Sequence, residues 1–264
     1  MATQSQLHVE RWVGGVTEQT LNQVAEEQPI ALTYHGIPHV VMLATPADLE
    51  DLATGFTLSE AVVERATEIA SVEVVSEAGA LEVRIAIAPE RFAALLRRQR
   101  NRVGRTGCGL CGAETIEQAI RHPAPVGTGP DITATQLHAA LAELHLRQPL
   151  NARTGSVHAA AWVLPDKGIQ LVREDVGRHN ALDKVIGALV RANIDCTAGY
   201  LIITSRASYE MVQKAATVGI TLLAAVSAPT ALAVRLAEAT GLTLIGFARA
   251  NQHVIYANSR RLSG

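Results

Sequence analysis

Two cysteines three positions apart are the part of this sequence best suited to chemistry. Cys108 and Cys111 lie in the segment from Thr106 to Gly112, where glycines flank both cysteines. Glycine permits many backbone conformations, so the segment suits a loop that presents a thiol to two different partners. Arginines precede it at positions 97, 98, 100, 102 and 105. Nearby positive charge favours the thiolate, which attacks persulfides, but cations also favour helix C-termini for structural reasons alone.

Three other uses of a Cys-x-x-Cys pair compete with sulfur transfer. A structural zinc site needs four ligands, and Cys196 is the one cysteine outside the pair. A zinc deaminase has a proline directly before its first cysteine, where this chain has Gly107. Thioredoxin-like oxidoreductases place the pair at a helix start after a strand, whereas an arginine-rich segment precedes this pair. The spacing alone leaves sulfur transfer and thiol redox chemistry nearly equal.

A second polar group follows a strand predicted at 168–172. Glu174, Asp175 and His179 lie between this strand and a predicted helix. We expect Asn180 to cap the helix and Asp183 to lie in its first turn. A capped helix with ion pairs at its N-terminus explains Asn180 and Asp183. The convergence of Glu174, Asp175 and His179 on one strand end favours a polar pocket instead.

Three short polar segments follow other predicted strands: Thr204 to Arg206, Ser227 to Thr230, and Phe247 to Gln252. Hydroxyl, amide and guanidinium groups at helix starts can bind phosphate. No Walker A motif is present, and the Gly-x-Gly-x-x-Gly run at 107–112 follows an arginine-rich segment and not a predicted strand, which argues against an ordinary P-loop or Rossmann site. We expect His158 to be a hydrogen-bonded core residue and Cys196 a buried filler.

Hydrophobic periodicity predicts an α/β fold in two parts. For residues 1–130 it predicts a smaller α+β part, with strands on both sides of a turn at 35–38, a helix opened by 45–46, a hairpin at 72–87 and a helix from 89. For residues 131–264 it predicts a helix at 133–146, strands at 168–172, 200–204, 221–226 and 243–247, and helices at 208–218 and 230–239. This alternation predicts a parallel or mostly parallel sheet covered on both faces, with ligands beyond the carboxyl ends of its strands.

Composition limits the classes of function. The chain has 264 residues, 48% hydrophobic and only 3% aromatic, so we expect a large aliphatic core. A net charge of -2 argues against binding to nucleic acid or to a membrane surface. An odd number of cysteines, a polar segment from Met1 to Glu10 and the lack of a long apolar run indicate a cytoplasmic protein.

The sequence resembles the FdhD/NarQ family of formate dehydrogenase accessory sulfurtransferases. The resemblance rests on the segments Cys108–Gly112, Glu174–Lys184, Ser208–Val212 and Ser227–Ala233, and extends to Thr45–Leu52, Gly55-Phe56, Gly246-Phe247 and Arg249. The run from Glu174 to Lys184 is the most specific, because it is long and dense in charge. The resemblance spans nearly the whole chain.

This resemblance implies a sulfur carrier without a metal of its own. It would take sulfur as a persulfide from a cysteine desulfurase and pass it to bis(molybdopterin guanine dinucleotide), which a guanine nucleotide would mimic, before insertion into formate dehydrogenase. Cys108 would hold the persulfide and Cys111 would assist. The cofactor-binding stretch would be Phe247, Ala248, Arg249, Ala250, Asn251 and Gln252. We expect Arg206, Arg249 and the helix starts, with Ser227 and Thr230, to bind the anionic end. We expect Glu174, Asp175 and His179 to lie nearer the pterin or sulfur.

The family resemblance also implies a homodimer and a fold like that of cytidine deaminases without their zinc. Ser156, Ser205, Gly107 and Ala61 depart from the family pattern and make the client enzyme less certain than the chemistry. Two alternatives stay open. The protein could shelter and deliver the cofactor with the cysteines as contacts alone, or it could be a thiol oxidoreductase.

Overall fold

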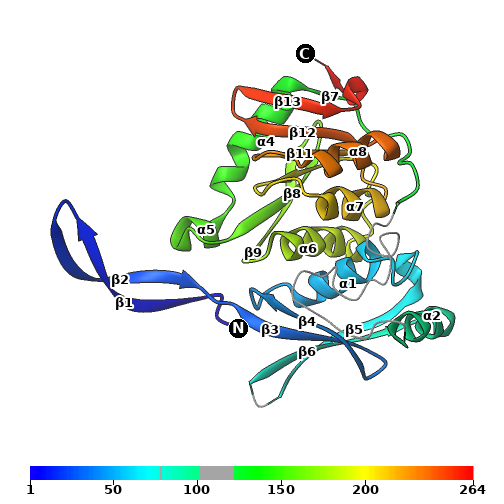
Figure 1. Cartoon of the computed structure of the whole chain (residues 1–264), viewed down its shortest axis with the longest axis horizontal. Coiled ribbons are helices and arrows are strands. Elements are labelled where there is room, and N and C mark those ends of the chain that lie inside the picture. The colour runs from blue at the N-terminus through cyan, green and yellow to red at the C-terminus, as the bar shows by residue number, and fades with distance from the viewer. Residues whose placement is uncertain (78, 101–121, 264) are drawn as a thin grey trace.

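Two β-sheets with helices between them form the body of the molecule (Figure 1). The computed structural model describes residues 1–77, 79–100 and 122–263. The larger sheet has the strand order β13-β12-β11-β10-β8-β9, and the smaller has the order β4-β3-β6-β5. Within the described ranges, no helix is long and apolar enough to cross a membrane.

The larger sheet is parallel only at its centre. Its strands are β8 (His158–Leu164), β9 (Gly168–Asp175), β10 (Tyr200–Ile203), β11 (Leu222–Ala225), β12 (Thr243–Arg249) and β13 (Gln252–Ala257). Strands β10, β11 and β12 pair in parallel, and all other pairings are antiparallel. The expected mostly parallel sheet is therefore wrong at both flanks. The turns that join β8 to β9 and β12 to β13 are too short for a crossover, so each pair forms a hairpin.

Helices cover both faces of this sheet, which gives three layers. Helices α6 (Arg178–Arg191), α7 (Tyr209–Thr217) and α8 (Ala231–Thr240) cover one face, and α4 (Ala134–Leu146) covers the other. The core under α6 to α8 contains Leu182 and Met211, and the core under α4 contains Leu137, Ile202 and Ile245. The short helix α5 (Pro149–Thr154) follows α4. The predicted α/β fold class is confirmed.

The smaller sheet contains both predicted N-terminal hairpins. Its strands are β3 (Gln28–Tyr34), β4 (Ile37–Ala44), β5 (Ile69–Glu77) and β6 (Ala80–Ile87). Helix α1 (Leu49–Ser59), the 3-10 turn η1 (Ala66–Glu68) and helix α2 (Pro89–Arg100) complete this part. Ile30, Leu32, Leu52 and Val83 lie in its core, so the sheet buries one face against α1. The predicted boundary between parts at residues 130 and 131 stays a prediction.

Several elements have no counterpart in the sequence prediction. Strands β1 (Gln4–Val13) and β2 (Val16–Ala25) form a hairpin that projects from the body, blue in Figure 1. Short strands β7 (Ile132–Thr133) and β14 (Leu262–Ser263) pair near the C-terminus, next to the 3-10 turn η2 (Ser259–Arg261). Neither β1 nor β2 buries a face. The two strands therefore lack the alternation of apolar and polar residues from which a strand is predicted.

Helices α1 and α6 touch backbone to backbone at two glycines. A Cβ on Gly55 would lie 1.8 Å from the carbonyl oxygen of Asp183, and a Cβ on Gly187 would lie 1.9 Å from that of Asp51. Since α1 belongs to the smaller sheet and α6 to the larger, this contact joins the two halves of the molecule. Any larger side chain at either position would force the helices apart.

We expect Gly55→Ala to lower the free energy of unfolding by about 3 kcal/mol, because α1 must move to accommodate the methyl group. Urea denaturation followed by circular dichroism measures this change. Gly127→Ala is the matched control, since a Cβ there meets nothing within 4 Å. Equal stability of the two variants would contradict the close helix contact.

Candidate functional site

The polar segments predicted as a site gather at one edge of the larger sheet. Thr204 and Val226 directly follow the parallel strands β10 and β11, and Arg249 ends β12. His158, which begins β8, pairs with Asp175, which ends β9. Because β8 runs antiparallel to β10, this pair lies at the same edge as the carboxyl ends of the parallel strands. Helices α6, α7 and α8 also begin there.

A cavity of about 540 Å³ lies at this edge, on the side of the sheet covered by α4. Leu141 and Leu144 of α4 contribute apolar surface. Polar groups come from both sides, and they belong to His145, Gln148, Asn151, His158, Thr204 and Arg249. An apolar wall with a few polar groups is the usual lining of a small-molecule site.

His158 lines this cavity, so its assignment as a core residue is wrong. The side chain is half-buried, and burial together with the nearby positive charge of Arg178 lowers its pKa. It is therefore neutral at neutral pH and can donate one hydrogen bond and accept another. Because β8 was not predicted as a strand, the sequence did not place His158 at the carboxyl edge.

The predicted cofactor stretch from Phe247 to Gln252 is a hairpin and not a helix start. Ala248, Arg249 and Ala250 line the cavity. Phe247 has a φ of 49° and is 38% exposed, and its N–H donates to the carbonyl of Ser227 at 3.2 Å. A left-handed backbone is uncommon for an aromatic residue and is concentrated at functional sites. The pairing register of β12 and β13 shifts here, which turns Phe247 out of the sheet.

The loops after β10 and β11 are bound to each other. The N–H of Thr230 donates to the carbonyl of Ala207 at 3.1 Å, and Ala207 and Pro229 form an isolated bridge. The Thr230 hydroxyl accepts from the N–H of Ala233 at 3.3 Å and so caps α8. Arg206 is exposed. These loops lie at the predicted edge, and their contact with a ligand stays a prediction.

Glu174 and Asp175 are both engaged within the fold. The Glu174 carboxylate accepts from the N–H groups of Leu150 and Asn151, at 2.9 and 2.7 Å. Asp175 is fully buried, 2.6 Å from Lys184, and accepts from the N–H groups of Thr45 and Gly177. Glu174 thus holds the start of α5, from which Asn151 lines the cavity. The expected direct role of the two acids toward a ligand stays a prediction.

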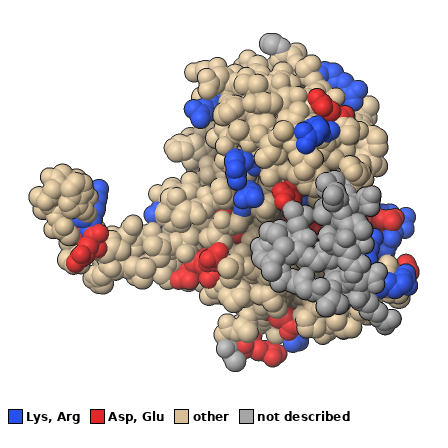
Figure 2. All heavy atoms as spheres, in the orientation of Figure 1, with Lys and Arg blue, Asp and Glu red and all other residues tan. Residues whose placement is uncertain are grey.

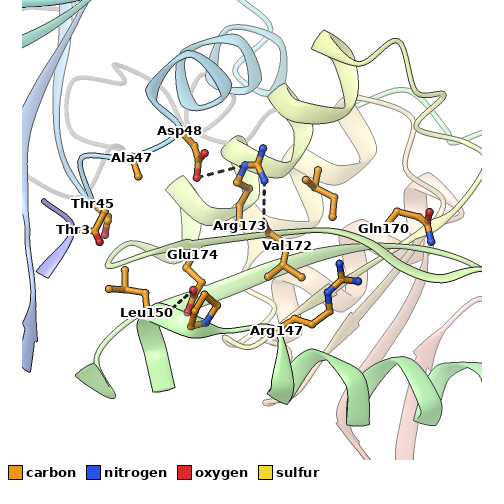
Figure 3. A pocket seen from close by; sticks show the side chains of 12 residues that line it. Thr3, Thr45, Ala47, Asp48, Arg147, Leu150, Gln170, Val172, Arg173 and Glu174 are labelled. Carbon is orange, nitrogen blue, oxygen red and sulfur yellow. Dashed lines mark hydrogen bonds and ion pairs between the residues drawn. The ribbon is translucent and has the colours of Figure 1, made fainter. Parts of the chain in front are cut away.

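Figure 3 shows Glu174 beside a second cavity, of about 430 Å³, between β9 and the segment around Thr45. In that view Arg173 points toward Asp48, and the two form an ion pair at 3.5 Å. Arg173 also donates to Asp51 at 2.8 Å. Because the charges of this second cavity are already paired, it offers less to an anionic ligand than the first.

Two predicted helix positions in the charged run are wrong. Helix α6 begins at Arg178 with Gly177 as its N-cap, so Asn180 lies inside the helix. The Asn180 amide donates to Asp175 at 2.9 Å and to the carbonyl of Leu43 at 2.8 Å. Asp183 lies in the second turn, fully buried, and its Oδ2 is 2.9 Å from Nζ of Lys214. Tertiary partners, and not the helix ends, determine where these polar side chains lie.

His179 lies in the first turn of α6, next to α7. Its Nε2 is 4.0 Å from a carboxylate oxygen of Glu210. Burial, followed by the positive charges of Arg178 and Lys214, lowers the pKa of His179 to about 4. The ring is therefore neutral at neutral pH.

Cys108 and Cys111, with Arg102 and Arg105, lie outside the described residues. Cys196 is half-buried against the core under α6 to α8, as a filler would be. Burial raises the pKa of its thiol to about 11, so this cysteine stays protonated and unreactive at neutral pH.

Comparison with known proteins identifies close relatives. The model of the FdhD/NarQ family matches residues 25–263. A sulfur carrier protein FdhD from Cupriavidus necator is 53% identical over 260 residues, covering 98% of this chain and 90% of that protein. A protein of the same name from Xanthomonas euvesicatoria pv. vesicatoria is 53% identical over 254 residues, covering 96% and 90%. The crystal structure of a proposed formate dehydrogenase accessory protein from Desulfotalea psychrophila has a TM-score of 0.79 at 21% identity, over 99% of this chain and 100% of that one, and so supports the fold.

We expect the ring of His179 to titrate with a midpoint near 4 in the folded protein, measured by NMR. In the unfolded chain a histidine titrates near 6.5, so the unfolded state binds a proton first as the pH falls. The neutral His179 ring therefore contributes its full share of the free energy of unfolding above about pH 6.5, and this share is lost as the pH falls from there to about pH 4. His179→Gln should reduce that acid-side loss, and a midpoint of 6 or higher would contradict the account.

Proposed function

The chain belongs to the FdhD/NarQ family, and we propose on this basis that it is a sulfur carrier for formate dehydrogenase. It accepts a persulfide sulfur from a cysteine desulfurase and delivers it to bis(molybdopterin guanine dinucleotide), the cargo, before insertion into the enzyme. The relatives named as sulfur carriers support the carrier role. The assignment of the cargo depends on one observation, the cavity at the carboxyl edge of the larger sheet that both Arg249 and His158 line.

The lining of this cavity fits the nucleotide end of such a cargo. Arg249 is an exposed cation at the cavity, and a guanidinium binds phosphate through charge-assisted hydrogen bonds. Asn151 and His158 offer hydrogen-bonding groups of the kind that read the edge of a base. Phe247 does not line the cavity, although its neighbour Ala248 does, and its half-exposed ring is the aromatic face available to a purine beside the cavity. These residues bind and orient the nucleotide.

Sulfur transfer in this proposal begins at Cys108. The Cys108 thiolate attacks the terminal sulfur of the donor persulfide, a new S–S bond forms, and the S–S bond of the donor breaks. The donor cysteine leaves as a thiolate, and Cys108 carries the sulfur as its own persulfide. Cys111 assists. Exchange of this kind requires a nucleophile and geometry rather than a tuned general acid, so the protein contributes positioning.

Mass spectrometry tests the sulfur step. After incubation with a cysteine desulfurase and cysteine, we expect the chain to gain the mass of one sulfur atom on Cys108, and Cys108→Ala to abolish the gain. Cys196→Ala is the matched control and should retain it, because the Cys196 thiol is half-buried and protonated. Labelling that persists in Cys108→Ala would place the persulfide on another cysteine and contradict the assignment to Cys108. No labelling of the natural chain would leave a delivery role without sulfur transfer. A Cys108–Cys111 disulfide and activity without a desulfurase would indicate an oxidoreductase.

Calorimetric titration with guanosine diphosphate tests the cargo site. We expect Arg249→Ala to weaken binding about tenfold, which corresponds to about 1.4 kcal/mol, because one charge-assisted contact to phosphate is lost. Arg235→Ala removes an exposed arginine on α8 and is the matched control, with unchanged affinity expected. Equal loss in both variants would indicate attraction by general charge and contradict the assignment.

A further inference from the structure

Two histidines from distant parts of the chain are hydrogen-bonded close to the cavity at the carboxyl edge. Nε2 of His138, on α4, lies 3.0 Å from Nδ1 of His253, on β13, and the centroids of the two rings are 5.2 Å apart. Both side chains are half-buried. The bond therefore joins α4 to the strand that contains the last residue of the predicted cofactor stretch, Gln252.

Each histidine is next to an element that lines the cavity. His138 lies one turn of α4 before Leu141, which lines the cavity, and residues three apart lie on the same face of a helix. His253 follows Gln252, which pairs with Arg249 across the hairpin of β12 and β13. Arg249 lines the cavity from this hairpin. The hydrogen bond therefore connects α4 and the hairpin beside the cavity that both of them line.

The end of this hairpin that carries Arg249 is weakly held by its own backbone. Strand β13 is at the edge of the larger sheet, so its one paired neighbour is β12 (Figure 1). Gly246 pairs with Val254, and the register then shifts before Arg249 pairs with Gln252. Such a shift disrupts the ladder locally, and His253 lies within it. Its side-chain bond to α4 supplies a restraint that the backbone ladder lacks there.

We propose that the hydrogen bond between His138 and His253 fixes the hairpin against α4 and so positions Arg249 in the cavity, and that uptake of a second proton by the two rings releases the hairpin. The two histidines are positioning residues and do not touch the ligand. Their role toward the nucleotide depends on the proposed function, whereas the bond and its release do not.

The number of added protons decides whether the bond exists. Two neutral imidazole rings form one N–H···N bond, because the facing nitrogen of one ring donates and that of the other accepts. A first added proton leaves that acceptor free, so the bond remains and becomes charge-assisted. A second added proton makes both facing nitrogens donors. The bond is then lost, and two positive charges repel each other across the gap between α4 and β13.

The surroundings keep the second proton off at neutral pH. Burial, followed by the positive charge of His138, lowers the pKa of His253. Other titratable or charged groups of the described residues lie on the elements packed against α4 or β13, or on α4 itself: Glu143, His145, His158, Arg173, Glu174, Asp175, Arg235, Glu238 and Arg249. None of them contributes to the shift of His253. Figure 2 shows few charged side chains around β12 and β13 on the face in view. The bond therefore holds at neutral pH and is lost as the pH falls.

NMR of the histidine ring nitrogens, with amide hydrogen exchange, tests the bond in the ligand-free protein. We expect a coupling across the N–H···N bond between His138 and His253 at about pH 7.5, lost as the pH falls below about 6. The amides of 250–254 should lose protection over the same range, while those of β10, which report global unfolding, stay protected. No coupling at neutral pH, or hairpin protection that is constant through the titration of His253, overturns the proposal.

Variants at position 138 separate hydrogen bonding from charge. His138→Leu removes the bond at every pH, so the hairpin amides should lose protection about tenfold at neutral pH. His138→Gln can donate to or accept from His253 without titrating, so it should keep that protection and remove the loss on acidification. His8→Leu removes an exposed histidine of β1 and is the matched control, with the behaviour of the natural chain expected. Equal protection in His138→Leu and the natural chain contradicts the restraint.

A double-mutant cycle with guanosine diphosphate connects the two histidines to Arg249. His138→Leu should weaken binding about fivefold in the natural chain and cause no further loss in Arg249→Ala, because the histidines act through Arg249. Additive losses contradict the positioning role. Absence of binding to the natural chain would overturn the proposed cargo site and the positioning role with it, while the ligand-free measurements decide the release of the hairpin separately.

Discussion

The contact between Gly55 of α1 and Gly187 of α6 is the constraint on which the rest of the structure depends. Two helix backbones can approach this closely only where neither residue has a side chain. The approach carries the smaller sheet against the helices of the larger one. It also buries the charges around it, because Asp51 of α1 accepts from Arg173 and Arg191, and Ser59 of α1 donates to Asp183 at 2.6 Å. The two parts of the chain therefore form one packed unit at this interface.

The charged run from Glu174 to Lys184, at the end of β9 and the start of α6, mainly stabilises that interface. Asp175 pairs with Lys184, and Asp183 pairs with Lys214, with all four side chains buried. Removal of one member of such a pair leaves an unpaired buried charge and costs about 3 to 5 kcal/mol. A run so dense in charge looks like a binding site in the sequence, and much of it is instead the polar core between α1, α6 and α7. The surface left for a ligand is the neighbouring edge of the larger sheet, around His158 and Arg249.

The sequence predicts those elements whose side chains alternate between a buried and an exposed face. Both hairpins of the smaller sheet and the helices α1, α2, α4, α7 and α8 follow from that periodicity. The gathering of polar segments at one sheet edge follows from the parallel order of β10 to β12. Sequence periodicity does not predict β1, β2 and β13 because they bury little, and it does not predict β8 because nearly all of its residues are buried. Local periodicity does not encode the pairing of strands that are distant in the sequence. It therefore does not predict that Asp175 and Asp183 are buried or that His158 lines a cavity.

The proposed function requires a cysteine that carries sulfur and a cavity that binds the nucleotide end of the cargo, and the helix contact at Gly55 holds the two parts of the chain together. A crystal structure with guanosine diphosphate bound tests its central claim most directly. We expect the nucleotide at the carboxyl edge of β10 to β12, with phosphate oxygens within hydrogen-bonding distance of Arg249 and polar contacts from Asn151 or His158. Nucleotide bound in the other cavity, beside Arg173, or on the outer face of the smaller sheet would contradict the account.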